Sequence, residues 1–214
     1  MRNVLFEDLE REEVEPLLPT LNATVQSYEK DEVIITAGEP FGQLGLILEG
    51  SVRIEHVNMW GDIAILTIME QGKTFGEASA CSGREQDFTA DYVAEQKAKV
   101  LFLDVDKIVN PQHDKLYESR VKLASNLTSL LARRYLELAR RSFVMTNRTI
   151  RTKVLAYLSI AAKAYGTKRF TIPYNREQLA SYLGVDRSAL SAELSRMEKD
   201  GLIRFHKSDF ELLR

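Results

Sequence analysis

NREQLASYLGVDRSALSAELSRMEKDGLI, residues 175–203, decides the fold of the C-terminal part of the chain. This stretch predicts two short helices that meet at a tight corner. Asn175 is a side-chain cap with Gln178 three residues later, which is the capping-box pattern of a helix start. Gly184 supplies the left-handed backbone that ends this helix, and Asp186 caps the helix that follows.

The two predicted helices carry apolar residues at spacings of three and four, which is the pattern of a buried helix face. These residues are Leu179, Tyr182, Leu183, Leu190, Leu194 and Met197. The other face of the second helix carries mostly short side chains, namely Arg187, Ser188, Ser191, Ala192 and Ser195. Such a face suits the major groove of DNA, which admits one helix and offers hydrogen-bonding base edges. The alternative is an ordinary helical hairpin whose second helix faces water.

Charge is divided unevenly along the 214 residues, although the net charge is only −2. Residues 144–214 carry 13 Lys and Arg against 7 Asp and Glu, while residues 1–143 carry 16 against 24. A basic end on an acidic body is typical of a polyanion-binding module attached to a second domain. The chain is long enough for one or two domains with a sizeable core.

Several functional classes find no support in the sequence. A single cysteine, Cys81, excludes an internal disulfide and an iron–sulfur cluster held within the chain. His56, His113 and His206 lack the spacing of a zinc or haem site, so we expect no metal. No nucleophile–base pair or carboxylate pair indicates an enzyme. The acidic start lacks the apolar core of a signal peptide, and no apolar run is long enough to cross a membrane, so we expect a cytoplasmic protein.

The first half predicts an all-β domain. A short helical lead-in covers residues 5–21, and short β-rich runs alternate with glycines from residue 24 to about residue 104. Strands of about five residues with turn signals every 8–12 residues indicate a sandwich or barrel.

Three segments in this half carry a resemblance to a known family: AGEP at 37–40, LEGSVRI at 48–54 and QGKTFGEASA at 71–80. Their order resembles the cyclic-nucleotide-binding β-roll (jelly roll) of the cAMP receptor protein and fumarate–nitrate regulator (Crp/Fnr) family. The resemblance implies that Gly76 and Glu77 lie in the phosphate-binding cassette, where the glutamate meets the ribose. It also implies an arginine about ten residues later for the cyclic phosphate, since a buried phosphate needs a charged, bidentate donor.

The chain departs from the family at the positions that would bind cAMP. Asp87 or Phe88 stands where the arginine is expected, and Leu138 and Ala139 stand where the family presents hydroxyls to the adenine. We therefore expect neither cAMP nor a cofactor, and interpret Gly76 and Glu77 as retained scaffold. The resemblance is closest to the branch without cyclic-nucleotide or iron–sulfur determinants.

A different small-molecule effector stays open. Its pocket would include Gly76, Glu77, Cys81, Phe88 and Leu138. Cys81 itself is open to two interpretations, a redox-sensing thiol or a small core residue, and its apolar neighbours favour the core.

Residues 114–143 contain no Gly or Pro and predict one long helix with two apolar stripes. One stripe comprises Leu116, Leu123, Leu127, Leu130 and Leu138, and the other Tyr117, Val121, Ala124, Leu131 and Tyr135. A helix of about 30 residues with two apolar faces covers two partners. We assign the leucine stripe to a parallel pair with the same helix of a second chain. A monomer with one broad buried face is the alternative.

The remaining C-terminal elements complete a winged helix-turn-helix. Residues 150–165 predict an amphipathic helix, RFTIP at 169–173 a strand, and LIRFH with DFELLR a hairpin turning at Lys207 and Ser208. The resemblance now spans nearly the whole chain and implies base contacts from Arg187, Ser188, Ser191 and Ala192. Basic residues assigned to phosphates, each of which could equally be solvated surface, are Lys168, Arg169, Arg176, Arg196, Lys199 and Lys207.

The sequence therefore predicts an α+β protein with a β-roll sensor (1–110), a dimerisation helix (111–143), a hinge (144–149) and a winged helix-turn-helix (150–214). The predicted function is a homodimeric regulator of transcription that binds palindromic double-stranded DNA, with RNA polymerase as the partner that the resemblance implies. An effector would shift the placement of the DNA domains about the hinge. The alternative function is a small-molecule-binding dimer whose C-terminal module docks on protein, which would lack the steep salt dependence of DNA binding.

Overall fold

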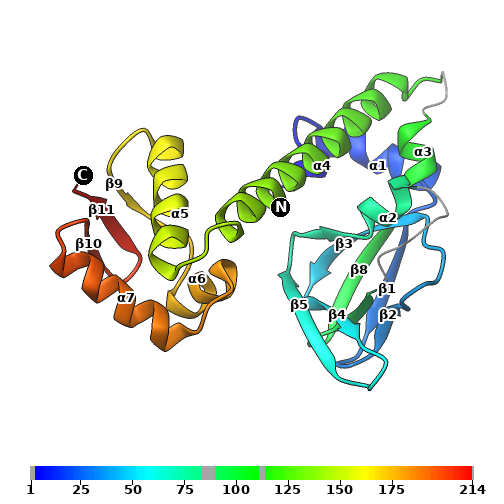
Figure 1. Cartoon of the computed structure of the whole chain (residues 1–214). Coiled ribbons are helices and arrows are strands. Elements are labelled where there is room, and N and C mark those ends of the chain that lie inside the picture. The colour runs from blue at the N-terminus through cyan, green and yellow to red at the C-terminus, as the bar shows by residue number, and fades with distance from the viewer. Residues whose placement is uncertain (1–2, 83–89, 111–113, 214) are drawn as a thin grey trace. The chain divides into compact units, whose positions relative to one another are not determined.

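The computed structural model of the chain describes residues 3–82, 90–110 and 114–213. The chain forms two compact units, residues 1–132 and residues 133–214 (Figure 1). The long helix α4, Tyr117–Met145, contributes residues to both units.

Two four-stranded antiparallel sheets build the N-terminal unit (Figure 1). The first has the strand order β1-β8-β3-β6, with β1 at Thr24–Tyr28, β8 at Ala98–Asp104, β3 at Gln43–Glu49 and β6 at Thr74–Phe75. The second has the order β2-β7-β4-β5, with β2 at Val33–Ile35, β7 at Asp91–Ala94, β4 at Ser51–Val57 and β5 at Ile63–Glu70.

The middle strand β8 is covered on both faces, which explains its unbroken apolar run. Val100 and Phe102 belong to one cluster of buried residues, together with Val52 and Ala94 of the second sheet. The alternate residues Leu101 and Leu103 belong to a second cluster, formed with helices. A strand buried on both sides has no polar face to present to water.

Helices cover the outer face of the first sheet. They are the short 3-10 turn η1 (Val4–Phe6), α1 (Arg11–Thr20), α3 (Val105–Val109) and the first part of α4. Figure 1 shows the N-terminal segment and α1 lying beside this part of α4. Asn126 of α4 fixes the packing, because its amide donates to the carbonyl oxygens of Leu5 at 3.1 Å and Glu7 at 2.6 Å. The short helix α2 spans Glu77–Ser82.

The β4–β5 hairpin is the most exposed apolar part of this unit. Strand β5 lies at the edge of its sheet, and it exposes Ile63, Ile65, Leu66 and Ile68. Trp60 at the turn is 79% exposed.

Two glycine turns of this unit differ in how closely they are surrounded. Gly50, between β3 and β4, has φ +80°, and a Cβ atom there would lie 2.2 Å from the carbonyl oxygen of Lys97. Gly61 has φ +85° with no atom within 4 Å of a Cβ position. Both need the left-handed backbone that glycine adopts most easily, but only Gly50 is also enclosed.

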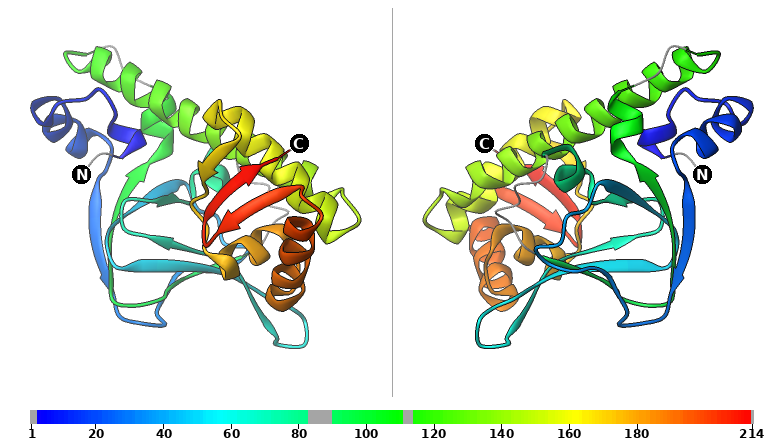
Figure 2. Two further views of the ribbon diagram at one scale, coloured as in Figure 1. Left: turned by 90° about the vertical axis from the view of Figure 1, so that its left-hand side faces the viewer. Right: turned by 90° about the vertical axis from the view of Figure 1, so that its right-hand side faces the viewer.

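The C-terminal unit packs three helices against a three-stranded sheet. Its elements after α4 are α5 (Ile150–Tyr165), β9 (Arg169–Thr171), α6 (Arg176–Leu183), α7 (Arg187–Lys199), β10 (Ile203–His206) and β11 (Asp209–Leu212). The strand order is β10-β11-β9, and Figure 2 shows the β10–β11 hairpin in red beside α7 in orange. One buried cluster joins the elements and includes Val144, Leu158, Phe170, Leu179, Leu190, Met197 and Phe210.

This architecture confirms the predicted fold class of β-roll, long helix and winged helix-turn-helix. Helix α5 has the bounds that the sequence predicts, and α4 begins three residues later and ends two residues later than the 114–143 segment. Within the part of the chain that the structure describes, no helix is long and apolar enough to span a membrane.

Candidate nucleic-acid interface

The corner between α6 and α7 is built by local capping, as the sequence predicts. The side chain of Asn175 accepts from the backbone of Gln178 at 2.9 Å, and the side chain of Gln178 accepts in return from the backbone of Asn175 at 2.9 Å. Gly184 ends α6 with φ +59°. Asp186 begins α7, because its carboxylate accepts from the backbone N–H of Ala189 at 2.8 Å. These contacts satisfy backbone groups at helix ends that have no partner within the helix.

Helix α7 presents the polar face that the sequence assigns to DNA. Its apolar side chains lie in the C-terminal core, whereas Arg187, Ser188 and Ala192 are exposed and Ser191 is half-buried. The hydroxyl of Ser191 donates to the carbonyl oxygen of Arg187 at 3.0 Å. The hydroxyl of Ser188 donates to Asp186. The two hydroxyls keep their lone pairs as acceptors, so Arg187 is the strongest donor among the predicted base-contact residues.

The turn of the wing is held by Arg176 at the start of α6. Its guanidinium carbon lies 5.1 Å from the ring centre of Phe205 and 6.0 Å from that of Phe210. Its Nη2 donates to the carbonyl oxygen of Lys207 at 3.4 Å. Burial lowers the pKa of Arg176, and a guanidinium stays charged at neutral pH despite such a shift. Arg176 thus orders the wing turn rather than extending freely into solvent.

A network of ion pairs joins α5 to α7. Arg151 donates through Nε to Glu193 at 2.6 Å, and its Nη1 lies 2.8 Å from a carboxylate oxygen of Asp200. The second oxygen of Glu193 lies 3.3 Å from Nη1 of Arg196. The hydrogen bond from Arg151 to Glu193 is the main cause that raises the pKa of Arg151. Glu193 is only 8% exposed, so it is a nearly buried carboxylate enclosed by two guanidinium groups.

The other predicted phosphate contacts form the exposed basic surface of the same unit. Lys168 directly precedes β9 and Arg169 begins it, Arg196 and Lys199 lie on the last turns of α7, and Lys207 lies at the tip of the wing. All five side chains are exposed.

The end of α4 is attached to the corner between α6 and α7. Arg141 donates to the carbonyl oxygens of Tyr182 at 3.3 Å and Ser181 at 3.4 Å. Val144 is fully buried in the C-terminal core. The predicted hinge at 144–149 therefore begins with a residue that packs in this unit, and its role as a hinge stays a prediction.

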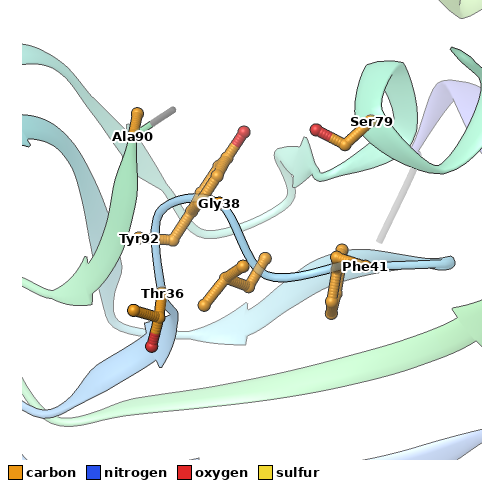
Figure 3. Close-up of a pocket in the computed structure, with 7 residues that line it drawn as sticks. Thr36, Gly38, Phe41, Ser79, Ala90 and Tyr92 are labelled. Carbon is orange, nitrogen blue, oxygen red and sulfur yellow. The ribbon is translucent and has the colours of Figure 1, made fainter. Parts of the chain in front are cut away.

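A small cavity lies in the β-roll, near the expected effector site (Figure 3). Its volume is about 30 Å³, and it is lined by Ile35, Thr36, Gly38, Phe41, Ser79, Ala90 and Tyr92. Such a volume holds one or two water molecules. Aromatic rings fill the space beside it, since Phe75 stacks on Tyr92 with ring centres 5.3 Å apart and meets Phe102 edge-on at 6.2 Å. The cavity that the described residues form is too small for a nucleotide.

Of the cassette residues, Gly76 lies against Phe41, which lines this cavity. A Cβ atom on Gly76 would lie 2.6 Å from the ring of Phe41 and 3.0 Å from the carbonyl oxygen of Gln43. Gly76 also has φ +79°, so the backbone conformation and its neighbours both require glycine. Glu77 is 1% exposed at the start of α2. The predicted pocket residue Phe88, like Asp87, lies outside the described residues.

The cysteine differs from its expected setting. Cys81 is exposed near the end of α2, so the interpretation as a core residue is wrong. Partial desolvation raises the pKa of its thiol, and the Glu77 carboxylate raises it further. A raised pKa disfavours the reactive thiolate. Apolar sequence neighbours were misleading because α2 is short and turns this side chain outward.

Comparisons with known families identify both units. Residues 25–110 match the family described as cyclic nucleotide-binding domain, and residues 152–214 match the Crp-like helix-turn-helix domain. The chain belongs to the Crp family of DNA-binding transcription regulators. The resemblance read from its sequence is thereby confirmed.

The similarity to known relatives and solved structures covers most of this Crp-family chain. The global nitrogen regulator of Synechococcus elongatus is 19% identical over 86% of the chain and 82% of its own length. The catabolite activator protein of Thermus thermophilus is 26% identical, with a TM-score of 0.53 over 98% of this chain and 93% of that one. The c-di-GMP-responsive regulator CLP of Xanthomonas campestris shares the fold at 16% identity, with a TM-score of 0.55 over 96% of this chain and 100% of that one.

The leucine stripe of this regulator requires a correction. Leu123 and Leu127 are buried in the N-terminal unit's own core, and Leu116 packs against the same cluster. Leu130 is also buried, with 7% of its surface exposed. These side chains are covered by the chain itself and cannot form the seam of a dimer. Leu138 is different, because it is 66% exposed. It belongs to the C-terminal unit, so its grouping with Gly76 and Glu77 in one effector pocket stays a prediction.

Sequence reasoning missed the ion pair between Arg151 and Glu193. In the sequence, Glu193 lies between Ala192 and Leu194 and looks like an ordinary charged surface residue. Its position three residues after Leu190 and four before Met197 places it near the buried face, which is the one local signal. The partner Arg151 is 42 residues away, and no local pattern connects the two.

Proposed function

We propose that this Crp-family regulator is a sequence-specific DNA-binding homodimer that inserts α7 of each copy into neighbouring major grooves. The observation that supports it most directly is the division of α7 into two faces. Its apolar side chains are buried in the C-terminal core, whereas the predicted base-contact positions face outward or are half-buried. A helix that is capped at a rigid corner and exposes one polar face suits insertion into a groove.

Base recognition would rest on a small set of side chains. Arg187 would donate both arms of its guanidinium to a guanine, while Ser188 and Ser191 would accept from base amino groups. Ala192, which has no polar atom, would pack on a thymine methyl group. Phosphates would be held by Lys168, Arg169, Arg196, Lys199 and Lys207, with Arg176 acting on them through the wing turn.

The second copy would pack along the exposed side of α4. Val121, Thr128 and Tyr135 are exposed and spaced by seven residues, and Leu138, one turn after Tyr135, is also exposed. A seven-residue period is the repeat of a helix pair. The expected dimer seam therefore moves from the leucine stripe to this exposed side, with Leu138 retained.

We propose that the effector of the β-roll is a small molecule other than cAMP. The small cavity and the rings of Phe41, Phe75 and Tyr92 that fill its surroundings support this view. RNA polymerase is the partner that we propose from membership of the family.

The test compares two variants on two duplexes, one selected from a random pool and one of random sequence. Arg187→Ala should lower the affinity for the selected duplex by about 1–3 kcal/mol and affect the random duplex much less. Lys207→Ala should weaken both duplexes alike and reduce the slope of log affinity against log salt by about 1. Equal losses on both duplexes for both variants, or a wild-type affinity that does not depend on salt, would overturn the proposal.

A further inference from the structure

The ion pairs around Glu193 join α5, the helix after the predicted hinge, to α7. Arg151 is the second residue of α5, while Glu193 lies in the middle of α7 and Asp200 directly follows its last residue. The guanidinium of Arg151 reaches both carboxylates, at 2.6 Å and 2.8 Å. The two acidic residues are seven positions apart, which is about two turns or 10.5 Å along a helix. One side chain thus holds α7 at two points on the same face.

Attachment at two points limits the rotation of α7 about its own axis. A rotation of about 10° moves a side-chain end on a helix of about 5–6 Å radius by about 1 Å. That movement exceeds the range of good hydrogen-bond lengths, so a bidentate contact from Arg187 to a base would be lost. Contacts to phosphates tolerate such a movement better, because an ion pair with a phosphate does not need the fixed geometry of a bidentate contact to a base edge.

The negative charge of Glu193 is a second reason why its ion pair with Arg151 matters for the position of α7. The carboxylate follows Ala192 directly on the helix that approaches the polyanion, and it is nearly buried. A buried carboxylate that loses one partner is strongly unfavourable and tends to move toward water or another cation. Arg196 alone would remain, at 3.3 Å, and it is needed at the phosphates.

We infer that Arg151 and Glu193 are positioning residues for base recognition, which fix the rotation of α7 on α5 without touching DNA themselves. This inference rests on the proposed function of α7. It predicts that the pair governs discrimination between sequences more than total affinity for DNA.

The experiment measures affinity for the selected duplex and for a random duplex with the full-length variants Arg151→Ala, Glu193→Gln and the double variant. Arg151→Ala should lower the affinity for the selected duplex about tenfold, with a smaller loss on the random duplex, so that the ratio of the two falls. Adding Glu193→Gln to Arg151→Ala should restore part of this ratio, because the uncompensated buried charge is then gone.

A matched control is the wing ion pair between Arg204 and Glu211, at 3.3 Å on the surface of the same unit. Arg204→Ala removes the same charge but should leave the ratio unchanged. Arg151→Lys keeps the charge but lacks the fork that reaches both carboxylates, so the ratio should fall partway while the melting temperature stays near that of the wild type. This variant keeps the test decisive if Arg151→Ala does not fold.

Three results would overturn the inference. An unchanged ratio in Arg151→Lys would mean that holding α7 at two points is not required. Equal losses on both duplexes without rescue by Glu193→Gln would mean that Arg151 contacts phosphate directly. A lower melting temperature with an unchanged ratio would show a role in stability alone. Failure of the proposed function looks different, because the wild type itself would then show no preference between duplexes.

Discussion

At the scale of single residues, Arg176 at the start of α6 holds the turn of the wing, which is far from it in sequence. Its guanidinium lies over the rings of Phe205 and Phe210 and donates to the carbonyl oxygen of Lys207. Lys207 itself has φ +52°, a conformation that a residue with a side chain adopts at some cost. The contact from Arg176 stabilises this turn, so its effect on DNA should pass through Lys207.

Arg176→Met tests this role, because methionine keeps apolar volume against the rings but loses the charge and the donor. We expect the free energy of unfolding to fall by about 0.5–2 kcal/mol, the range of a cation–π contact between exposed and desolvated sites. DNA affinity should also fall, and adding Lys207→Ala should cause little further loss. Titrations of both single variants and the double variant with one duplex measure this, and fully additive losses would show that Arg176 binds phosphate independently.

Prediction from sequence at this scale succeeded where the cause was local. The exposure of Arg187, Ser188 and Ala192 followed from the helical period alone. The environment of Cys81 did not follow, because exposure depends on which way a two-turn helix faces. The pairing of Arg151 with Glu193 joins helices far apart in sequence and required the folded structure.

At the scale of elements, the caps of α6 and α7 decide where the corner lies. The carboxylate of Asp186 accepts from the hydroxyl of Ser188 and from the backbone of Ala189, and these bonds lower its pKa from the ordinary value of 3.8. The folded-state pKa therefore lies below the unfolded one. This group stabilises the folded state at pH above 3.8, and the stabilisation is lost as pH falls through the folded pKa.

Asp186→Asn keeps the acceptor oxygen but removes this titration. The wild type should be the more stable of the two at neutral pH, by an amount that stays constant down to about pH 5 and shrinks below the ordinary pKa of 3.8. Urea unfolding of both proteins between pH 7 and pH 3 measures the difference in their free energies of unfolding. The other carboxylates contribute equally to both proteins, so their contributions drop out of this difference. A difference that persists unchanged at pH 3 would contradict the assignment.

Elements with strong terminal signals were predicted most accurately. Helix α5 spans Ile150–Tyr165, as predicted, between the cap Thr149 and Gly166. The short elements β6 and α2 were not predicted, because runs of two to six residues carry no measurable period. The two apolar stripes of α4 were predicted from the sequence. The helical period indicates that a face of the helix is buried, but it does not indicate whether the same chain or a second chain buries it. The leucines were therefore assigned to the wrong partner.

At the scale of the whole molecule, α4 separates two kinds of apolar contact. Leu127 lies in the core of its own unit, while Leu138 is exposed one turn after Tyr135, at the edge of the seam that we propose for the second copy. A substitution at Leu127 should therefore change the free energy of unfolding, whereas one at Leu138 should change dimerisation.

Leu138→Glu should shift the protein from dimer toward monomer in sedimentation at micromolar concentration, with little change in the unfolding of each unit. Leu127→Ala, the control, should lower the free energy of unfolding by about 2–5 kcal/mol, as for other buried leucines, without a direct effect on association. A wild type that sediments as a single chain, or a Leu138→Glu variant that remains a dimer, would contradict this placement of the seam.

The two glycine turns of the β-roll would diverge differently as a lineage of this regulator accumulates substitutions. At Gly50 the nearest obstacle is the carbonyl oxygen of Lys97, part of a backbone that cannot rotate aside. At Gly61 a side chain would meet open space, and asparagine tolerates the same handedness. Descendants should therefore keep the first glycine long after the second has drifted to asparagine.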